Sequence, residues 1–208
     1  MSTKIHDMLR ETNVIPVLAF TEVDETLKII GNMISGGVTV IELTMRSPVA
    51  LQTLERAKAE FGDHATLGMG TIMNAQQLKD VRAAGADFGV SPGLTPSLRD
   101  AIVDSDLPFL PGVANVSQAM GAQDAGFYFQ KFFPAEQAGG APYLKSIGAV
   151  LPDVTFCPTG GVNTKNAPDY LSLTNVGCVG TSALTALAKP DGWDLGAFQA
   201  QVAAHLPA

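Results

Sequence analysis

Residues 38–46 read Val-Thr-Val-Ile-Glu-Leu-Thr-Met-Arg, and this stretch begins as a short apolar run rich in β-branched residues. Such a run is too short for a helix, so Val38–Leu43 is predicted to be a buried strand. An amphipathic helical pattern follows over Pro48–Phe61, with a proline near its start and Gly62 just after its end. A strand that passes directly into a helix is the repeating unit of a parallel sheet covered by helices.

The same unit recurs along the chain. Further strand-like runs lie at Val14–Ala19, Thr66–Met69, Phe88–Val90, Pro108–Leu110, Tyr128–Phe133, Val154–Cys157 and Val176–Val179. Helical patterns lie between them, for example at Val23–Ile34, Ala75–Ala84, Ser97–Val103, Ser117–Gln123 and Ala141–Ala149. Eight strand–helix units predict an α/β protein with a (β/α)8 TIM-barrel fold, at the small end of its usual size range.

A doubly wound open sheet uses the same alternation of strands and helices. We favour the barrel because eight units are too many for a flavodoxin-like sheet and because no G-x-G-x-x-G segment follows the first strand. An extra N-terminal helix expected over Lys4–Glu11 would cap the bottom of the barrel. No linker or low-complexity stretch interrupts residues 1–208, so a single barrel domain is expected.

The composition excludes several classes of protein. With 208 residues, 46% of them hydrophobic, and with 21 glycines and 13 prolines, the chain is neither collagen-like nor disordered. Its 13 basic and 20 acidic residues give a net charge of −7 without a basic run, so neither nucleic acid nor a membrane surface is an expected partner. No apolar run is long enough to span a bilayer.

The cysteines and the N-terminus indicate a cellular compartment. Cys157 and Cys178 both lie in apolar runs and cannot form a disulfide framework. The first 13 residues are polar and mixed in charge, unlike a signal peptide. We therefore expect a cytoplasmic protein with reduced thiols. The three histidines, His6, His64 and His205, show no ligand spacing, so no metal site is expected.

Lys131 stands out in the sixth predicted strand. Strand alternation places Phe129, Lys131 and Phe133 on one face, and a lysine in so apolar a strand is rare. If this face is the barrel interior, burial disfavours the charged ammonium, and a neutral amine can attack a carbonyl carbon to form a Schiff base. The alternative is a structural lysine whose stem packs in the wall while its head reaches water.

Glu42 is placed by the same alternation on the inward face of the second predicted strand, near its C-terminal end. A carboxyl group there is a candidate general acid and base. The alternative is an ion pair with Arg46 or Lys131. A full Glu42–Lys131 pair would keep the lysine protonated, so catalysis requires Arg46, or the surroundings of a bound anion, to hold the two partly apart. The Arg46 fork itself suits a carboxylate ligand.

The seventh and eighth predicted strands end in Cys157-Pro158-Thr159-Gly160-Gly161 and Val179-Gly180-Thr181-Ser182. Glycines at these two strand ends let backbone N–H groups approach an anion, and this is the common phosphate site of α/β barrels. Glycine also ends strands for purely structural reasons, but the paired position favours phosphate binding. Thr71 and Pro92 end the third and fourth strands and are candidate pocket residues, or else turn residues.

These segments together resemble the KDPG/KHG aldolases, which cleave 2-keto-3-deoxy-6-phosphogluconate (KDPG) or 4-hydroxy-2-oxoglutarate (KHG) through a Schiff base. The resemblance covers roughly residues 15–184. It rests on these segments in the family's order: Gly37–Arg46, Gly70-Thr71-Ile72, Ser91–Thr95, Pro111-Gly112-Val113, Lys-Phe-Phe-Pro-Ala-Glu at 131–136, and Thr159-Gly160-Gly161. Lys-Phe-Phe-Pro-Ala-Glu combined with Glu-x-Thr-x-Arg at 42–46 is a specific combination.

The resemblance implies a class I aldolase of the Entner–Doudoroff type. It would split KDPG, a phosphorylated keto acid, into pyruvate and glyceraldehyde 3-phosphate, as a homotrimer without a metal or organic cofactor. Lys131 would form the imine and Glu42 would be the acid and base. The resemblance further implies a carboxylate site of Arg46, Thr71 and Thr159, pocket walls of Pro92 and Phe133, and a phosphate site of Gly160, Gly161, Gly180, Thr181 and Ser182.

Three positions depart from the family pattern. Met45 stands in place of leucine or phenylalanine, Gln130 replaces an apolar residue before the lysine, and Gly180-Thr181-Ser182-Ala183 replaces Gly-Gly-Ser-Trp. The last change affects the phosphate end, so KHG or the galactonate epimer of KDPG stays an alternative substrate. A barrel that binds phosphosugars without catalysis, with Lys131 as an ion-pair partner, is the non-enzymatic alternative.

Overall fold

Strands and helices alternate along the chain in the computed structural model, which describes residues 2–9 and 12–206. The strands are β1 (Val14–Leu18), β2 (Val40–Thr44), β3 (Thr66–Gly70), β4 (Phe88–Val90), β5 (Phe109–Leu110), β6 (Gly112–Val113), β7 (Phe129–Phe132), β8 (Thr155–Pro158) and β9 (Val179–Thr181). The helices are α1 (Ser2–Leu9), α2 (Val23–Ser35), α3 (Ala50–Phe61), α4 (Ala75–Ala83), α5 (Pro96–Val103), α6 (Val116–Asp124), α7 (Gly140–Gly148), α8 (Ala167–Leu171) and α9 (Leu195–Ala203), with a 3-10 turn, η1, at Thr185–Ala188.

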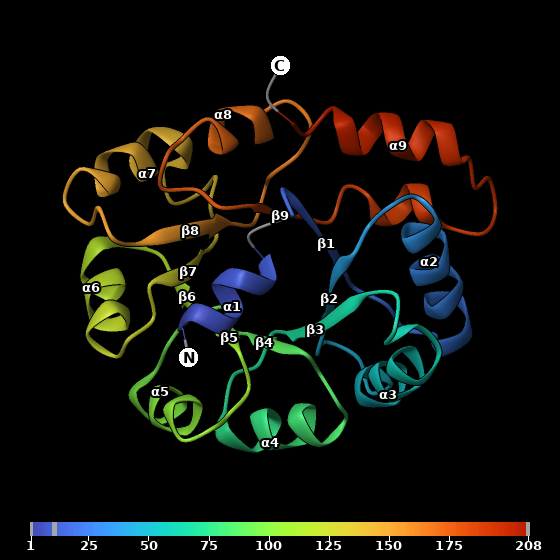
Figure 1. Cartoon of the computed structure of the whole chain (residues 1–208), viewed down its shortest axis with the longest axis horizontal. Helices are drawn as coiled ribbons and strands as arrows, with labels where there is room; N and C mark the ends of the chain where they lie inside the picture. The colour runs from blue at the N-terminus through green and yellow to red at the C-terminus, as the bar shows by residue number, and fades with distance from the viewer. Residues whose placement is uncertain (1, 10–11, 207–208) are drawn as a thin grey trace.

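The strands form a curled parallel sheet. Six of them pair in the order β5-β4-β3-β2-β1-β9, and three more in the order β6-β7-β8. Only Pro111 separates β5 from β6, and two isolated parallel bridges, Phe156↔Val176 and Thr159↔Gly180, join the β8 side to the β9 side. The strands therefore follow one another round a ring, with the helices other than α1 outside it (Figure 1).

Two of the strands differ from the sequence prediction. The run Pro108–Leu110 forms β5, and the structure adds the unpredicted β6 after it, since Pro111 cannot donate a ladder hydrogen bond and separates the two. The last strand is Val179–Thr181 and not Val176–Val179. Val176 bridges to Phe156 in β8, whereas Val179 pairs with Val14 in β1, so this apolar run changes partner along its length.

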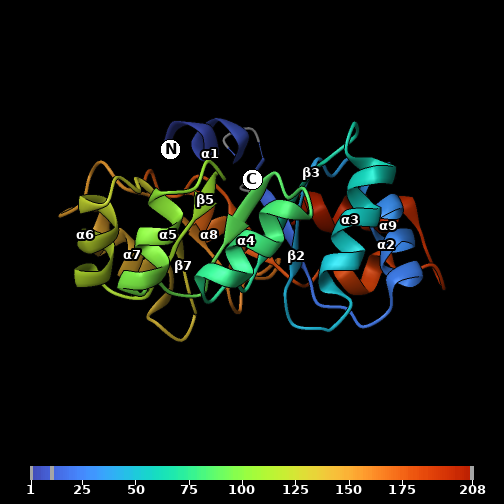
Figure 2. The same cartoon turned by 90° about the horizontal axis from the view of Figure 1, so that it is seen from below.

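The inside of the ring is filled by its own apolar cluster. Inward side chains from the strands form it, namely Ile15, Val40, Phe88, Val90, Leu110, Phe129, Cys157 and Cys178. Ile5 and Leu9, four residues apart on one face of α1, belong to the same cluster and are buried. Figure 2 shows α1 lying across one face of the ring. The helix thus covers one end of the interior.

The expected helix boundaries hold to within a few residues. α1 spans Ser2–Leu9 rather than Lys4–Glu11, and the end of that prediction, residues 10–11, lies outside the described part of the chain. α3 begins at Ala50, two residues after Pro48. His205 follows the end of α9. Among the described residues, no helix combines the length and the apolar character that crossing a membrane requires.

Candidate active site

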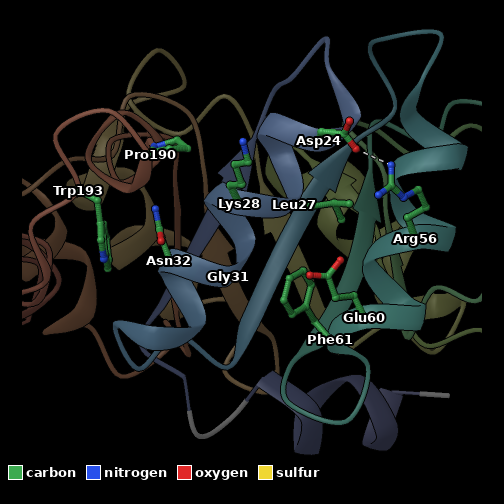
Figure 3. A pocket seen from close by; sticks show the side chains of 10 residues that line it. All are labelled: Asp24, Leu27, Lys28, Gly31, Asn32, Arg56, Glu60, Phe61, Pro190 and Trp193. Carbon is green, nitrogen blue, oxygen red and sulfur yellow. Dashed lines mark hydrogen bonds and ion pairs between the residues drawn. The ribbon is translucent and has the colours of Figure 1, made fainter.

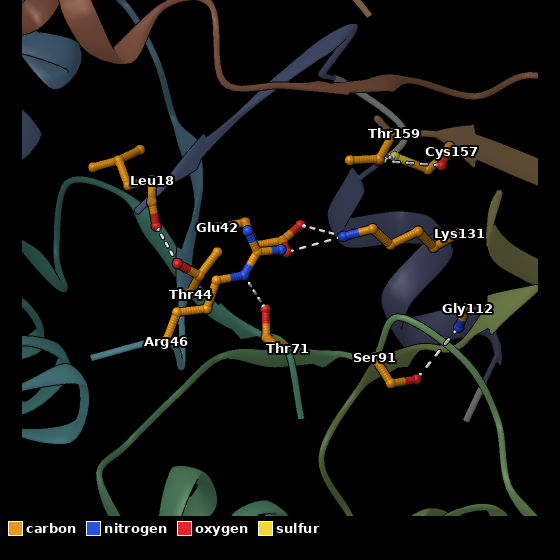
Figure 4. A network of polar contacts seen from close by, with 10 residues as sticks. All are labelled: Leu18, Glu42, Thr44, Arg46, Thr71, Ser91, Gly112, Lys131, Cys157 and Thr159. Atoms are coloured by element: carbon orange, nitrogen blue, oxygen red, sulfur yellow. Dashed lines mark hydrogen bonds and ion pairs between the residues drawn. The ribbon is translucent and has the colours of Figure 1, made fainter. Parts of the chain in front are cut away.

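Strand ends carry the candidate residues to one rim of the ring. Glu42 and Thr44 are in β2, Arg46 and Thr71 follow β2 and β3, and Lys131 is in β7 (Figure 4). Because neighbouring parallel strands all run the same way, residues at their C-terminal ends meet at the same edge.

Lys131 points into the ring and is buried. Its side chain is 7% exposed, and its Nζ lies 3.1 Å from Oε1 and 3.4 Å from Oε2 of Glu42, whose side chain is 5% exposed. The ammonium lies 5.6 Å from the centre of the Phe133 ring. Phe129, two residues earlier, belongs to the interior cluster. The predicted inward face of this strand is therefore confirmed.

Lys131 and Glu42 form a full ion pair. Such a pair was expected to keep the lysine protonated and therefore unable to attack a carbonyl carbon. Arg46 does not hold the two groups apart. Its Nε donates to Thr71 Oγ1 at 3.1 Å, and within the described residues no hydrogen bond joins Arg46 to Glu42. Burying two isolated charges costs several kcal/mol each, and their mutual contact offsets that cost. The pair therefore adds no net charge to the interior of the ring.

A glycine makes room for the Glu42 carboxylate. Gly70 ends β3 and pairs with Thr44 of β2, so it lies beside the end of the Glu42 strand. A Cβ atom on Gly70 would overlap Glu42 Oε1. The Thr44 hydroxyl donates to Leu18 O at 2.7 Å and ties β2 to β1 on its other side. Glu42 is thus held between two fixed strands, and the glycine sets where its carboxylate can lie.

Thr71 has a strained backbone at the Arg46 contact. Its φ is +64°, in the left-handed region that non-glycine residues seldom adopt. Such strain costs about 1–3 kcal/mol and is retained where the surroundings demand it. Here it accompanies the hydrogen bond that orients the Arg46 side chain, which is otherwise exposed. The guanidinium keeps its NH1 and NH2 donors for a ligand, since within the described residues they bond to no other group.

A cavity of about 360 Å³ opens on the Arg46 side of the rim. Lys131 and Glu42 do not line it, but Phe133, whose ring centre is 5.6 Å from Lys131 Nζ, does. Eight of the candidate site residues named from the sequence line the cavity, namely Arg46, Phe133, Thr159, Gly160, Gly161, Gly180, Thr181 and Ser182. Val17, Val162, Asn163 and Ala183 complete its lining. Sequence reasoning missed the first three and had noted Ala183 only as a departure from the family pattern at the phosphate end. Asn163 directly follows the glycine pair, but a side chain in a loop gives no periodic signal of its direction.

Gly160 and Gly161 form a turn with φ values of +98° and +81°, which glycine adopts without strain. The Gly160 carbonyl accepts from Glu136 N at 3.1 Å. The Gly161 carbonyl accepts from Asn163 Nδ2 and Asn166 Nδ2, each at 3.0 Å. In the part of the chain that the structure describes, the Gly161 N–H donates to no protein group. A free N–H at a cavity wall is a ready donor for an anion.

The three polar residues near this turn differ in what their hydroxyls can do. Thr181 Oγ1 is buried, donates to Val162 O at 2.8 Å and accepts from Ala183 N at 3.1 Å, so it holds two loops together. Thr159 is also buried, and Gly180 lies so close that a Cβ there would overlap Thr159 Oγ1. Ser182 is exposed and makes no side-chain hydrogen bond within the described residues. Its hydroxyl is the available one.

Pro92 and Thr71 lie outside the lining of this cavity. Pro92 instead packs on β6, where a Cβ on Gly112 would overlap its carbonyl carbon. Ser91 beside it is fully buried, and its Oγ accepts from Gly112 N at 3.3 Å. Gly112 is the register partner of Lys131. The end of β4 therefore supports the lysine strand through β6, a role that the sequence did not indicate.

Cys157 and Cys178 are free thiols in the interior, as expected for small core residues. A hydrogen bond to Cys157, followed by burial, raises the pKa of the Cys178 thiol well above its usual range. The thiol therefore stays protonated and unreactive. Within residues 2–9 and 12–206, no group of three His, Cys, Asp or Glu side chains is placed to hold a metal ion.

A larger hollow lies elsewhere, between α2, α3 and the segment before α9 (Figure 3). It has a volume of about 670 Å³, and Leu27, Phe61 and Trp193 contribute apolar surface to it. Its acidic and basic groups include Arg56 and Asp24, which pair with each other at 2.6 Å. None of the candidate site residues lines it.

Comparison with known proteins decides the family. The model of the KDPG and KHG aldolase family matches residues 5–195. The chain belongs to this aldolase family. A relative from Pseudoalteromonas atlantica named 2-dehydro-3-deoxy-phosphogluconate aldolase is 42% identical over 178 residues, which cover 86% of this chain and 82% of the relative.

Solved structures of the aldolase family share the architecture. The KDPG aldolase of Legionella pneumophila, with pyruvate captured as a covalent carbinolamine, has a TM-score of 0.88 and 39% identity, covering 99% of this chain and 98% of the other. The 2-keto-3-deoxy-6-phosphogluconate aldolase of Zymomonas mobilis with 3-phosphoglycerate has a TM-score of 0.90 and 38% identity, covering 99% and 96%. The predicted α/β fold is thus confirmed at the level of a curled parallel sheet of this family.

Proposed function

We propose that this protein is a class I aldolase that cleaves KDPG into pyruvate and glyceraldehyde 3-phosphate. The observation that carries the proposal is the buried Lys131–Glu42 pair beside a cavity that ends in a glycine turn. An amine and a carboxylate in contact are the two groups that an imine mechanism needs. The names of the relatives and the pyruvate adduct of the Legionella protein support the same chemistry.

The first half of the reaction forms the imine. Within the pair, Lys131 passes one proton to Glu42, which yields a neutral amine and a carboxylic acid without creating net charge. The amine attacks the C2 ketone, and the ketone oxygen takes the proton from Glu42 to give a carbinolamine. Glu42 then accepts a proton from nitrogen and returns it to the hydroxyl, which leaves as water. The product is a protonated imine on Lys131.

The second half breaks the C3–C4 bond. Glu42 takes the proton of the C4 hydroxyl, and the electron pair of C3–C4 moves into the imine as glyceraldehyde 3-phosphate departs. The enamine left on Lys131 regains a proton at C3 from Glu42. Attack of water on the resulting imine releases pyruvate and restores the amine. The site contributes positioning and a water-poor surrounding in which one carboxyl group serves every proton transfer.

The proposed substrate contacts follow from the cavity lining and, for Thr71 and Pro92, which lie outside that lining, from the family resemblance. Arg46 and Thr71, with Thr159 nearby, would hold the carboxylate of the keto acid, because a guanidinium fork binds carboxylates bidentately. Phe133 and Pro92 would wall the carbon chain. Gly160, Gly161, Gly180 and Ser182 would receive the phosphate through N–H groups and one hydroxyl. The Thr181 hydroxyl is already engaged, so we assign Thr181 to holding the loop in shape.

Borohydride trapping tests the chemistry. The wild-type protein is reduced in the presence of pyruvate, digested and mapped by mass spectrometry, with Lys131→Met and the surface variant Lys165→Met treated in parallel. We expect a pyruvate-derived adduct on Lys131 in the wild type and in the surface variant. If no adduct forms on Lys131 in the wild type, the imine mechanism is wrong, and the protein is a phosphosugar-binding barrel without this catalysis.

The choice of substrate needs a separate comparison. The family includes enzymes that act on KHG, which lacks the phosphate, and Ala183 stands at the phosphate end of the cavity. Turnover of KDPG, of its galactonate epimer and of KHG is measured side by side. Our proposal expects KDPG to have the highest kcat/KM, and equal turnover of KHG would assign the protein to the KHG alternative.

We further infer one (β/α)8 domain over residues 1–208, with α1 as a plug, that acts as a cytoplasmic homotrimer without a metal or organic cofactor. The ring order of the strands and the contribution of α1 to the interior support the barrel. The free thiols support a reducing compartment, and the family resemblance supports the trimer. Light scattering measures the assembly, and full activity in a chelator is expected.

A further inference from the structure

Glu136 and Tyr170 form a contact next to the glycine turn that none of the roles above uses. Tyr170 is on α8 and fully buried, and its hydroxyl donates a short hydrogen bond to Glu136 Oε1. Glu136 follows β7 in the loop that leads to α7. The bond therefore joins the loop after the lysine strand to the helix after β8.

Glu136 also lies directly against the glycine turn. Its backbone N–H donates to Gly160 O at 3.1 Å, and the N–H of Ala135 donates to Thr159 O at 2.8 Å. A Cβ atom on Gly161 would lie 2.6 Å from Glu136 Cγ. The stem of the glutamate thus forms one wall of the turn, and its carboxylate is held from behind by the tyrosine.

α8 is attached to the other side of the same turn. Asn166 comes directly before α8, and its Nδ2 donates to Gly161 O while its Oδ1 accepts from Asn163 N at 2.8 Å. Tyr170 lies four residues further on, so the helix reaches the turn at one end and Glu136 at the other. Both carbonyl groups of the turn are engaged, whereas the Gly161 N–H bonds to no group in residues 2–9 and 12–206.

We propose that the Glu136–Tyr170 hydrogen bond is a clamp that holds the Gly160–Gly161 turn in the shape that accepts a phosphomonoester. Both residues are positioning residues, since neither lines the cavity. An anion gains most from N–H groups that are already aligned, because no energy is then spent on ordering them. The proposal rests on the proposed function in taking this turn as the phosphate site.

The donor of the clamp keeps its proton well above neutral pH. Burial, together with the hydrogen bond to the Glu136 carboxylate and its charge, raises the pKa of Tyr170. The phenol therefore remains protonated and able to donate well above neutral pH. We expect no loss of the clamp on the alkaline side of the activity profile.

Steady-state kinetics on two substrates test the clamp. Tyr170→Phe removes only the hydroxyl, Glu136→Ala removes the acceptor, and Glu136→Gln keeps an oxygen that can accept. Tyr143→Phe is the matched control, because the Tyr143 hydroxyl bonds to no group within the described residues while its ring stacks on Phe132. The substrates are KDPG and the same keto acid without its 6-phosphate.

If the hydrogen bond acts as this clamp, removing it should weaken the binding of the phosphorylated substrate only. Tyr170→Phe and Glu136→Ala should raise KM for KDPG about tenfold, the effect of losing one hydrogen bond to a charged group, with kcat/KM for the unphosphorylated substrate unchanged. Glu136→Gln should keep KM for KDPG close to the wild-type value, and Tyr143→Phe should behave as wild type. Equal losses on both substrates, or no change in either variant, would overturn the proposal.

A binding measurement separates this proposal from the proposed function. Titration calorimetry with inorganic phosphate needs no turnover and is performed on the wild type, Tyr170→Phe and Glu136→Ala. Weaker phosphate binding by both variants supports the clamp even if the wild type fails to cleave KDPG, an outcome that would reject the aldolase alone. Unchanged phosphate affinity, or no phosphate binding by the wild type, rejects the clamp even if KDPG is cleaved.

Discussion

The buried ion pair between Lys131 and Glu42 makes a prediction about stability that is independent of turnover. Their charged atoms are 3.1 Å apart, and the side chains are 7% and 5% exposed. At an effective dielectric constant of about 20, two unit charges at this distance attract by about 5 kcal/mol. The attraction offsets desolvation, so removing one partner leaves an uncompensated buried charge. Either single substitution is then expected to cost about 3–5 kcal/mol.

A double-mutant cycle isolates the pair. The variants are Glu42→Gln, Lys131→Met and the double substitution, each compared with wild type by urea unfolding at neutral pH and at one protein concentration. We expect the double variant to lose less stability than either single variant, because no unpaired charge then remains. The coupling energy should exceed about 2 kcal/mol. If instead the losses of the two single variants simply add, the two groups are not paired and the mechanism has lost its basis.

A surface ion pair provides the control for this cycle. Arg56 and Asp24 are 2.6 Å apart, closer than the buried pair, but their side chains are 50% and 79% exposed. Solvent screens such a pair, and the same cycle with Arg56→Met and Asp24→Asn should give less than about 1 kcal/mol of coupling. The contrast tests burial rather than distance as the source of the effect.

Three further substitutions test the surroundings of the site. Gly70→Ala places a methyl group where Glu42 Oε1 lies, and kcat/KM measured with KDPG should fall by about 100-fold or more, the scale of a 1 Å misplacement. Gly180→Ala displaces Thr159 in the same way. It should raise the pyruvate concentration that gives half-maximal borohydride trapping on Lys131. Gln130→Leu removes two hydrogen bonds and an unsatisfied acceptor, so urea unfolding should show a loss of about 1–2 kcal/mol with kcat unchanged.

The strand order and the rim of candidate residues could be predicted because they depend on local patterns. Alternation puts Lys131 on one strand face with Phe129 and Phe133, and Glu42 on one with Val40 and Thr44, so both were candidates for the interior. Strand polarity puts Arg46 and Gly160 at the same rim. Lys131 and Glu42 are 89 positions apart in the sequence, so their direct contact depends on how their strands are arranged in the ring. The sequence could show that both were candidates for the interior but not that they touch.

Elements without a periodic pattern could not be predicted. α8 has five residues and η1 four, too few to display an amphipathic face. The Tyr170–Glu136 contact joins residues 34 positions apart through one of these short elements. Gln130 stands beside Lys131 in the sequence, yet its bonds to Ala119 O and Phe127 O depend on how α6 and the segment after it pack on the sheet.

The full ion pair changes the expectation that such a contact silences the lysine. That expectation treated the proton as fixed on nitrogen. In a buried pair, passing a proton from Lys131 to Glu42 creates no net charge, so the contact is compatible with the first step of the proposed mechanism. Arg46 bonds to Thr71 instead of Glu42, and in our proposal its guanidinium meets the carboxylate of the keto acid. Under that proposal, the carboxyl group needed for the next step already lies beside the amine.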